Sequence, residues 1–292
     1  MTQQKSRSSA TTTLRALAMM IRPVNCLMMG FAVVVGEVAI LGGIPTPNQL
    51  VLGFSVSFLL TASSMIHNDV IDLEIDRINA PQRPLPSGMV SRERALIASA
   101  FFGITGILAA LPLSWIAALI AILTFASSYA YNTKGKRLGI VGNVMVAFCI
   151  AMPFLFGGIV VLSTINVTVA AFFLLAFLSN IGREVTKGIA DVEGDRTKGI
   201  MTVAVSSGEK KASRLAAAFY ILPVMITPLP YLLGNLGMLY LVIVAAVDAG
   251  FIYSSLSILR SQTKGAALSV KRQVRYWMLL AMVAFLLGGI AK

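Results

Sequence analysis

Acidic side chains gather at the ends of two apolar runs of this sequence, and their spacing suits a metal site. The stretch "NDVIDLEID" follows the run "LVLGFSVSFLLTASSMI", and its Asn68, Asp72 and Asp76 are four residues apart. The stretch "ADVEGD" places Asp191 and Asp195 at the same spacing. A four-residue spacing puts side chains on one face of a helix, so each stretch predicts a stripe of oxygen ligands.

Stacked carboxylates repel one another, and two such stripes are best explained if cations lie between them. Oxygen ligands without a cysteine or histidine cluster favour a hard ion, Mg²⁺ above all, which completes its shell with water and phosphate oxygens. The sequence therefore predicts Mg²⁺ as the cofactor. Asp69, Glu74 and Glu184 point to other faces, and Glu74 and Glu184 are interpreted as solvated loop residues.

Basic residues near the stripes fit a phosphate ligand. Arg77 follows Asp76 directly, and Arg83 lies in the proline-rich loop "APQRPLPSG". Arg183 and Lys187 precede Asp191 by two turns and one turn, while "SSYAYNTKGKR" brings Tyr131 and Lys134 to the same side of the membrane. Carboxylates, Mg²⁺ and cations around a diphosphate form the expected site for a pyrophosphate leaving group. One acid at a helix end is usually solvated, but two matching stripes flanked by cations favour a site.

The composition indicates an all-α integral membrane protein. Of the 292 residues 57% are hydrophobic and only 12% are charged, with a mean hydropathy of +0.83. About 20 mostly apolar residues span the hydrocarbon. Nine runs of this kind occur, at residues 17–42, 50–67, 95–111, 113–131, 138–161, 165–185, 212–232, 236–258 and 274–291.

Charge placement predicts the topology. The odd-numbered connections carry no charge, whereas the N-terminal arm and the even-numbered connections are basic; of 24 lysines and arginines only Lys292 falls on the other side. The positive-inside rule then places the N-terminus and both acidic stripes on the cytoplasmic side, and the C-terminus outside. The net charge of +12 reflects this topology and an anionic ligand, and no nucleic-acid partner is expected, because no basic domain stands outside the membrane.

These motifs together resemble the UbiA-type intramembrane prenyltransferases. "NDVIDLEID" is similar to their first metal motif, "DVEGD" to their second, "YNTK" to a third, and "RPVN" at residues 22–25 is typical of them. The resemblance covers about residues 15–290. It implies nine helices around a central cavity capped by cytoplasmic loops, with an N-terminal arm at 1–14 and one domain at 15–292.

The resemblance also implies a reaction and roles for individual residues. A polyprenyl group would be transferred from its diphosphate with Mg²⁺, after charge withdrawal weakens the allylic C–O bond and gives C1 cationic character. The residues expected to act are then Asp72, Asp191, Tyr131 and Lys134 in catalysis; Asn68, Asp72, Asp76, Asp191 and Asp195 at the metal; and Arg22, Asn25, Tyr131 and Lys134 at the substrates. Arg77, Arg183 and Lys187 are added to the substrate-binding set on charge and spacing.

The acceptor is the least determined part of the prediction. Three stretches, "EIDRINAPQRPLPSG", "RLGIVGNVMVAF…FLFGGI" and "REVTKGIADVEGD", look closest to the archaeal branch that adds a geranylgeranyl chain to geranylgeranylglyceryl phosphate. Aromatic-acceptor and chlorophyll-type relatives share the metal signature and stay open as alternatives. Membrane lipids, but no protein partner, are implied.

An ion-coupled transporter is the alternative from a different class. Glu37 and Asp248 lie deep in the first and eighth apolar runs, and acids inside a membrane usually face a cavity or a partner. Transporter sites usually lie near the midplane, however, whereas the acidic stripes lie at one membrane face. This placement favours the enzyme.

Overall fold

The computed structural model describes residues 10–165, 167–197 and 199–291, and within these ranges the chain is helical and contains no strand. Among the described residues, nine helices are long and apolar enough to cross a membrane, as the sequence predicts. They are α2 (Pro23–Leu41), α3 (Pro47–Ile71), α5 (Arg92–Ala110), α6 (Trp115–Thr133), α7 (Ile140–Leu162), α8 (Val167–Ala190), α11 (Glu209–Ile226) continued by α12 (Leu229–Leu232), α13 (Met238–Arg260) and α14 (Lys264–Ile290). The chain is therefore a multi-pass membrane protein.

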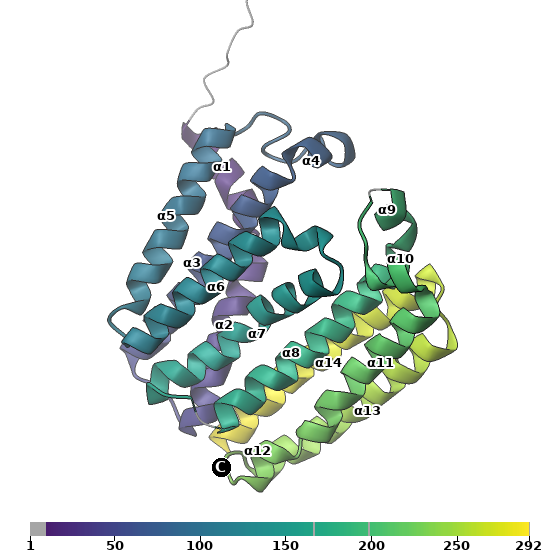
Figure 1. Cartoon of the computed structure of the whole chain (residues 1–292). Coiled ribbons are helices and arrows are strands. Elements are labelled where there is room, and N and C mark those ends of the chain that lie inside the picture. The colour runs from purple at the N-terminus through teal and green to yellow at the C-terminus, as the bar shows by residue number, and fades with distance from the viewer. Residues whose placement is uncertain (1–9, 166, 198, 292) are drawn as a thin grey trace, which may run out of the picture.

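The short elements lie mostly at one end of this bundle. They are α1 (Ala10–Ile21), α4 (Leu73–Asn79), the 3₁₀ turn η1 (Gly135–Arg137), α9 (Val192–Thr197) and α10 (Val203–Ser207). In Figure 1, α4, α9 and α10 lie at the top, whereas α12 and the C-terminus lie at the bottom. Loops rich in charge thus gather at the end of the bundle where the acidic stripes are.

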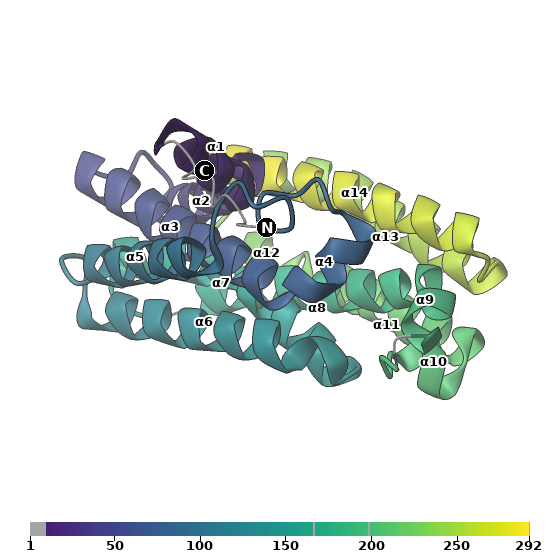
Figure 2. The same cartoon turned by 90° about the horizontal axis from the view of Figure 1, so that it is seen from above.

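The spans form two groups of helices joined through a middle layer (Figures 1 and 2). On one side α3 packs against α5 and α6, and on the other side α11 packs against α13. Between them α2 contacts α3, α7 and α14, and α8 contacts α7, α11 and α14. The middle layer therefore brings the ends of α3 and α8, which carry the two acidic motifs, to the same end of the bundle.

Local sequence signals explain where several spans begin. Thr46 caps α3 by accepting a hydrogen bond from the Gln49 backbone N–H, while the Gln49 side chain accepts from the Thr46 N–H, a reciprocal pair that satisfies two free donors. Ser114 caps α6 and Thr263 caps α14 in the same position. These caps fix the ends of helices whose length the membrane requires.

The first apolar run, expected to be one span over residues 17–42, is instead divided. Arg22 adopts a left-handed backbone conformation with φ 53° and ψ 70°, and Pro23 begins the next helix. A proline disfavours the α conformation of the residue before it, which explains the break. As a result α1 is separate from the span α2. Residues 1–9 of the predicted arm lie outside the described part of the chain, and the predicted boundary at residue 15 falls inside α1.

Candidate active site

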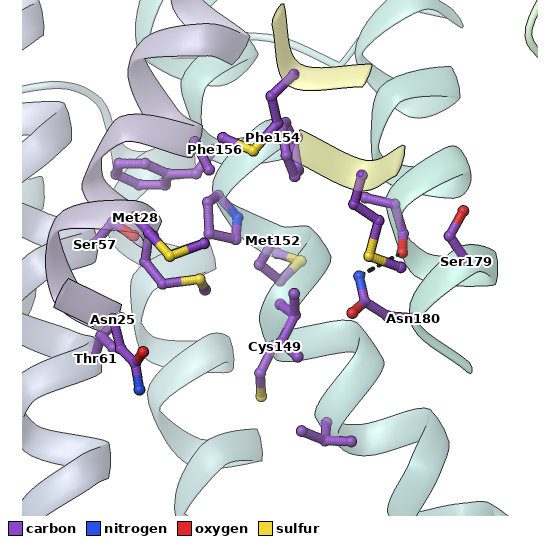
Figure 3. A pocket seen from close by; sticks show the side chains of 18 of the residues that line it. Asn25, Met28, Ser57, Thr61, Cys149, Met152, Phe154, Phe156, Ser179 and Asn180 are labelled. Carbon is purple, nitrogen blue, oxygen red and sulfur yellow. Dashed lines mark hydrogen bonds between the residues drawn. The ribbon is translucent and has the colours of Figure 1, made fainter. Parts of the chain in front are cut away.

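A cavity of about 700 Å³ lies between the helices of the middle layer and their neighbours. Helices α2, α3, α6, α7, α8, α11, α13 and α14 all contribute to its wall, and most of the wall is apolar. Figure 3 shows Met28, Met152, Phe154 and Phe156 in this wall, with Asn25 and Asn180 among them. Methionine side chains adapt their shape easily, so a wall of this kind suits a long and flexible hydrocarbon chain.

The first acidic motif lies where α3 ends and α4 begins. Asp72 joins the two helices, and its N–H donates to the Asn68 carbonyl at 2.9 Å, while the Asp76 N–H donates to the Asp72 carbonyl at 2.8 Å. The four-residue hydrogen-bond pattern therefore continues through the junction. The Asn68 side chain donates to Asp72 Oδ2 at 3.0 Å. The predicted stripe is thus intact, and its members contact one another.

Two cations hold this stripe. Lys136 Nζ lies 2.8 Å from Asp72 Oδ2, and Arg83 donates to Asp76 Oδ2 at 2.6 Å. The Asp76 carboxylate, with its hydrogen bond, raises the pKa of the Arg83 guanidinium above its ordinary value, so Arg83 stays charged at any practical pH. Arg77, in contrast, pairs with Glu74 on the surface, where both side chains are more than half exposed. Arg83, rather than Arg77, is therefore the arginine that ties the loop to the motif.

Asp69 has a role that the periodicity of the motif did not predict. Its carboxylate is buried and accepts a hydrogen bond from Arg22 at 2.6 Å, and Arg83 lies 3.9 Å away. The two partners are 47 residues apart, so only the fold brings them together. The left-handed backbone of Arg22 is an uncommon conformation for a residue other than glycine, and such strain concentrates at functional sites.

The second acidic motif repeats the geometry of the first. Asp191 lies between α8 and α9; its N–H donates to the Lys187 carbonyl at 3.0 Å, and the Asp195 N–H donates to the Asp191 carbonyl at 2.9 Å. Asp191 is exposed. In each motif, therefore, one aspartate stands at the junction of two helices: Asp72, which is partly buried, and Asp191, which is exposed.

Glu184, interpreted from the sequence as a solvated loop residue, is buried in α8. It pairs with Arg183 at 2.8 Å and with Lys187 at 3.5 Å. Its spacing from Lys187, one turn of helix, was the sequence signal for this contact. The carboxylate holds the two cations that we expected at the diphosphate.

The third motif lies at the end of α6. Tyr131 is partly buried and lines the cavity, and Asn132 donates to the Ser64 carbonyl of α3 at 3.2 Å. Lys134 caps the end of α6 and is exposed. The turn η1 contains Lys136, which pairs with Asp72 and which no sequence motif indicated as a site residue.

Five of the predicted site residues meet at the cavity, and the others lie outside its lining. Those that line it are Arg22, Asn25, Asn68, Tyr131 and Arg183. Those that do not are Asp72, Asp76, Arg77, Lys134, Lys187, Asp191 and Asp195. Asn68 lies one turn before Asp72, and Arg183 lies two turns before Asp191. We therefore infer that the cavity opens toward both stripes.

The donor set fits a magnesium ion, although the carboxylates are held by cations. No three acidic, histidine or cysteine side chains within residues 10–165, 167–197 and 199–291 already converge as a metal site. The motifs nevertheless offer only carboxylate and amide oxygens, which Mg²⁺ prefers, and phosphate oxygens of a substrate would complete its shell. The cations beside Asp72 and Asp76 supply positive charge at the same positions.

The two acids suggested for a transporter are not among the residues that line the cavity. Glu37 is fully buried in α2 but is not among the lining residues, and neither of its carboxylate oxygens has a hydrogen-bond partner among the residues described. Asp248 accepts a hydrogen bond from Thr227 at 2.8 Å. Neither acid therefore provides a site for an ion at the cavity.

Comparison with known proteins identifies the class. The UbiA prenyltransferase family matches residues 29–288, and the chain belongs to this family of intramembrane prenyltransferases, as its motifs predicted. It is similar to the digeranylgeranylglyceryl phosphate synthase of Thermococcus kodakarensis, with 38% identity over 93% of this chain and 96% of the relative. The synthase of Methanopyrus kandleri is 37% identical over 94% of this chain and 98% of the relative.

Solved structures agree with this fold. A structure described as giving insights into digeranylgeranylglyceryl phosphate synthase in membranes superposes with a TM-score of 0.86 at 32% identity, covering 96% of this chain and 99% of that one. A UbiA homolog from Archaeoglobus fulgidus, bound to DMAPP and Mg²⁺, superposes with a TM-score of 0.66 at 16% identity, covering 91% of this chain and 99% of that one. The latter likeness concerns the fold alone.

Proposed function

We propose that this protein transfers a geranylgeranyl group from geranylgeranyl diphosphate to the glycerol hydroxyl of geranylgeranylglyceryl phosphate, releasing diphosphate. The observation that carries the proposal is the identity of 38% to a synthase of this name over nearly the whole of both chains. The apolar cavity, with polar and cationic residues at one end, suits two hydrocarbon chains whose polar heads meet there.

Asn68, Asp72, Asp76, Asp191 and Asp195 would hold Mg²⁺, which withdraws negative charge from the departing diphosphate. Lys136 pairs with Asp72, and Arg183 and Lys187 pair with Glu184 of α8. These three cations, together with Lys134, would neutralise the non-bridging oxygens. As this charge is withdrawn, the bond between C1 and the diphosphate oxygen weakens and C1 becomes cationic. Tyr131 lines the cavity, and its ring would stabilise that cation through its π face.

The C1–O bond to diphosphate breaks, the acceptor hydroxyl oxygen bonds to C1, and the hydroxyl proton passes to the departing diphosphate. Asn25 lines the cavity one turn below Arg22 and would orient the acceptor head. The loop that carries Arg83, tied to Asp76 at 2.6 Å, would close over the site and keep water from capturing the cation. Arg77, on the surface with Glu74, would attract the anionic substrates from a distance.

We further propose that the N-terminus and the active site face the cytoplasm and that the C-terminus lies outside. The basis is the distribution of charge: lysines and arginines lie in the connections at the end of the bundle that carries α4 and α9, and the connections at the other end carry none. The positive-inside rule assigns the basic end to the cytoplasm.

The deciding experiment is an assay of purified protein with Mg²⁺ and geranylgeranyl diphosphate. We expect geranylgeranylglyceryl phosphate to be prenylated, and 4-hydroxybenzoate and homogentisate not to be. EDTA in excess should stop the reaction, and added Mg²⁺ should restore it. A phenolic product without an ether-lipid product would reject the glyceryl acceptor while leaving the prenyltransferase class intact.

A further inference from the structure

Among the residues that the structure describes, three arginines line the cavity, and no aspartate or glutamate does. Two of them are paired with buried carboxylates: Arg22 lies 2.6 Å from Asp69, and Arg183 lies 2.8 Å from Glu184. The third, Arg275 on α14, has no carboxylate partner among the residues described. The positive charge that the cavity presents to a ligand therefore comes above all from Arg275.

Arg275 is the second residue of the apolar run at 274–291, so it stands where the polar part of α14 gives way to the apolar part. It is the twelfth residue of α14, about 16 Å along the helix axis from Lys264. An arginine inside a membrane span is costly unless it faces a cavity or a partner, or reaches the interface. Arg275 is exposed near the end of the span and also lines the cavity, so its charge is accessible to a ligand there.

Below Arg275 the same face of α14 is apolar. Met278, Met282 and Phe285 follow it at helical spacing, and all three line the cavity. Ten residues of helix extend about 15 Å, so one wall offers a cation followed by a hydrocarbon groove of that length. This is the shape of a single-chain lipid with an anionic head.

Helix α2, which packs against α14, also has an arginine followed by cavity-lining residues deeper in the bundle. Arg22, Asn25 and Met29 line the cavity in turn, and α2 and α14 pack together at their far ends, where Gly289 lies against Ala39. As spans one and nine, the two helices run in the same direction, so their arginines lie toward the same end. Neither helix carries an aspartate of the two metal motifs.

We propose that Arg275 binds the phosphate monoester of the acceptor lipid and that the α14 groove holds the acceptor's hydrocarbon chain. This inference rests on the proposed function. The diphosphate belongs with the motifs at the ends of α3 and α8, and an acceptor oxygen must approach C1 from the side away from the departing diphosphate. We place the acceptor at the wall formed by α2 and α14, which carries no aspartate of either motif, and Arg275 would supply there the charge that a dianionic head requires.

The test compares Arg275→Gln with the wild type in the purified full-length enzyme. The KM for geranylgeranylglyceryl phosphate should rise about 10- to 100-fold, the worth of one hydrogen bond to a charged group, while the KM for geranylgeranyl diphosphate and kcat at saturating acceptor stay within about twofold. Arg272→Gln is the matched control, because Arg272 lies on the same helix but outside the cavity lining, and it should change neither KM.

A second readout separates phosphate recognition from a general disturbance. The acceptor without its phosphate, geranylgeranylglycerol, should be used equally by the wild type and by Arg275→Gln. Arg275→Met, which suits an apolar helix if the glutamine variant does not fold, must show the same selective rise in KM. An equal rise for both substrates, or no change in the acceptor KM, overturns the inference.

The phosphate could also belong to a bilayer lipid, and the lipid composition distinguishes the two sources. In vesicles of phosphatidylcholine alone and of phosphatidylcholine with phosphatidylglycerol, the effect of Arg275→Gln on the acceptor KM should be the same. If the substitution only abolishes a dependence on phosphatidylglycerol, Arg275 binds a bilayer headgroup and the inference is wrong. If the wild type fails to prenylate the glyceryl phosphate at all, the proposed function fails instead.

Discussion

Lys136 Nζ lies 2.8 Å from Asp72 Oδ2, so the first aspartate of the first metal motif is held by a lysine from the connection after α6. Each side chain is 25% exposed, and the pair therefore lies at the surface of the site rather than in the core. A contact of this kind is exchanged at modest cost when stronger partners arrive. We expect Asp72 to turn to Mg²⁺ and Lys136 to turn to the diphosphate when the substrate binds.

This relationship predicts different roles for two neighbouring lysines. Lys136→Ala should lower kcat/KM for geranylgeranyl diphosphate by about 100-fold, since it removes one donor that stabilises the leaving group. Lys134→Ala should have a smaller effect, because Lys134 is exposed and makes no ion pair among the residues described. Steady-state kinetics of both variants with varied diphosphate provide the comparison, and an effect confined to Lys134→Ala would reject the assignment.

The metal site predicts the consequences of removing its aspartates. Asp72→Ala and Asp191→Ala should each reduce turnover by about 1,000-fold or more, because the metal would lower the free energy of the charged transition state by several kcal/mol. Both proteins should still elute as folded species in detergent, because neither side chain is buried. Glu74→Ala, two residues from Asp72 and exposed in α4, is the matched control, and its turnover should match that of the wild type. Near-normal turnover with either aspartate variant would contradict the two-motif site.

The pair between Arg83 and Asp76 predicts an effect on stability. The Asp76 side chain is only 10% exposed, so Arg83→Ala leaves a nearly buried carboxylate without its donor, at a cost of about 1–3 kcal/mol. Because Arg83 keeps its charge at any practical pH, this contribution should not vary with deprotonation of the arginine. Arg77→Ala, which breaks an exposed pair, should cost less than about 1 kcal/mol.

Thermal unfolding in detergent and limited proteolysis of residues 80–91 measure this difference. Arg83→Ala should unfold at a lower temperature than Arg77→Ala and should be cleaved faster in the loop. Equal behaviour of the two variants would mean that the Asp76 contact does not hold the loop.

The topology predicts opposite labelling of two exposed positions. In a background with Cys26→Ala and Cys149→Ala, Ile78→Cys on α4 should react with an impermeant reagent only from the cytoplasmic side. Leu233→Cys, at the end of α12, should react only from outside. Right-side-out and inside-out vesicles give the two arms, and labelling of both positions from one side would contradict the proposed orientation.

Local spacing predicted the stripes of the active site because hydrogen bonding within a helix depends on residues four apart. Asn68, Asp72 and Asp76 stay aligned even though α3 ends at Ile71, since the backbone hydrogen bonds continue through the junction. The break at Arg22, in contrast, was missed. Hydropathy measures the length of an apolar run but not its backbone conformation, although Pro23 was the local signal for a change of direction.

The sequence by itself determined the class of protein, the number of spans and the two acidic motifs, because membrane thickness and helical periodicity act on nearby residues. Only the tertiary structure decided which side chains meet. Asp69 joins Arg22 across 47 residues, and Lys136 joins Asp72 across 64. That Arg275 lines the cavity likewise depends on which face of α14 turns inward. Packing among nine helices sets these contacts, and no local pattern encodes which of two neighbouring charges, Lys134 or Lys136, is directed into the site.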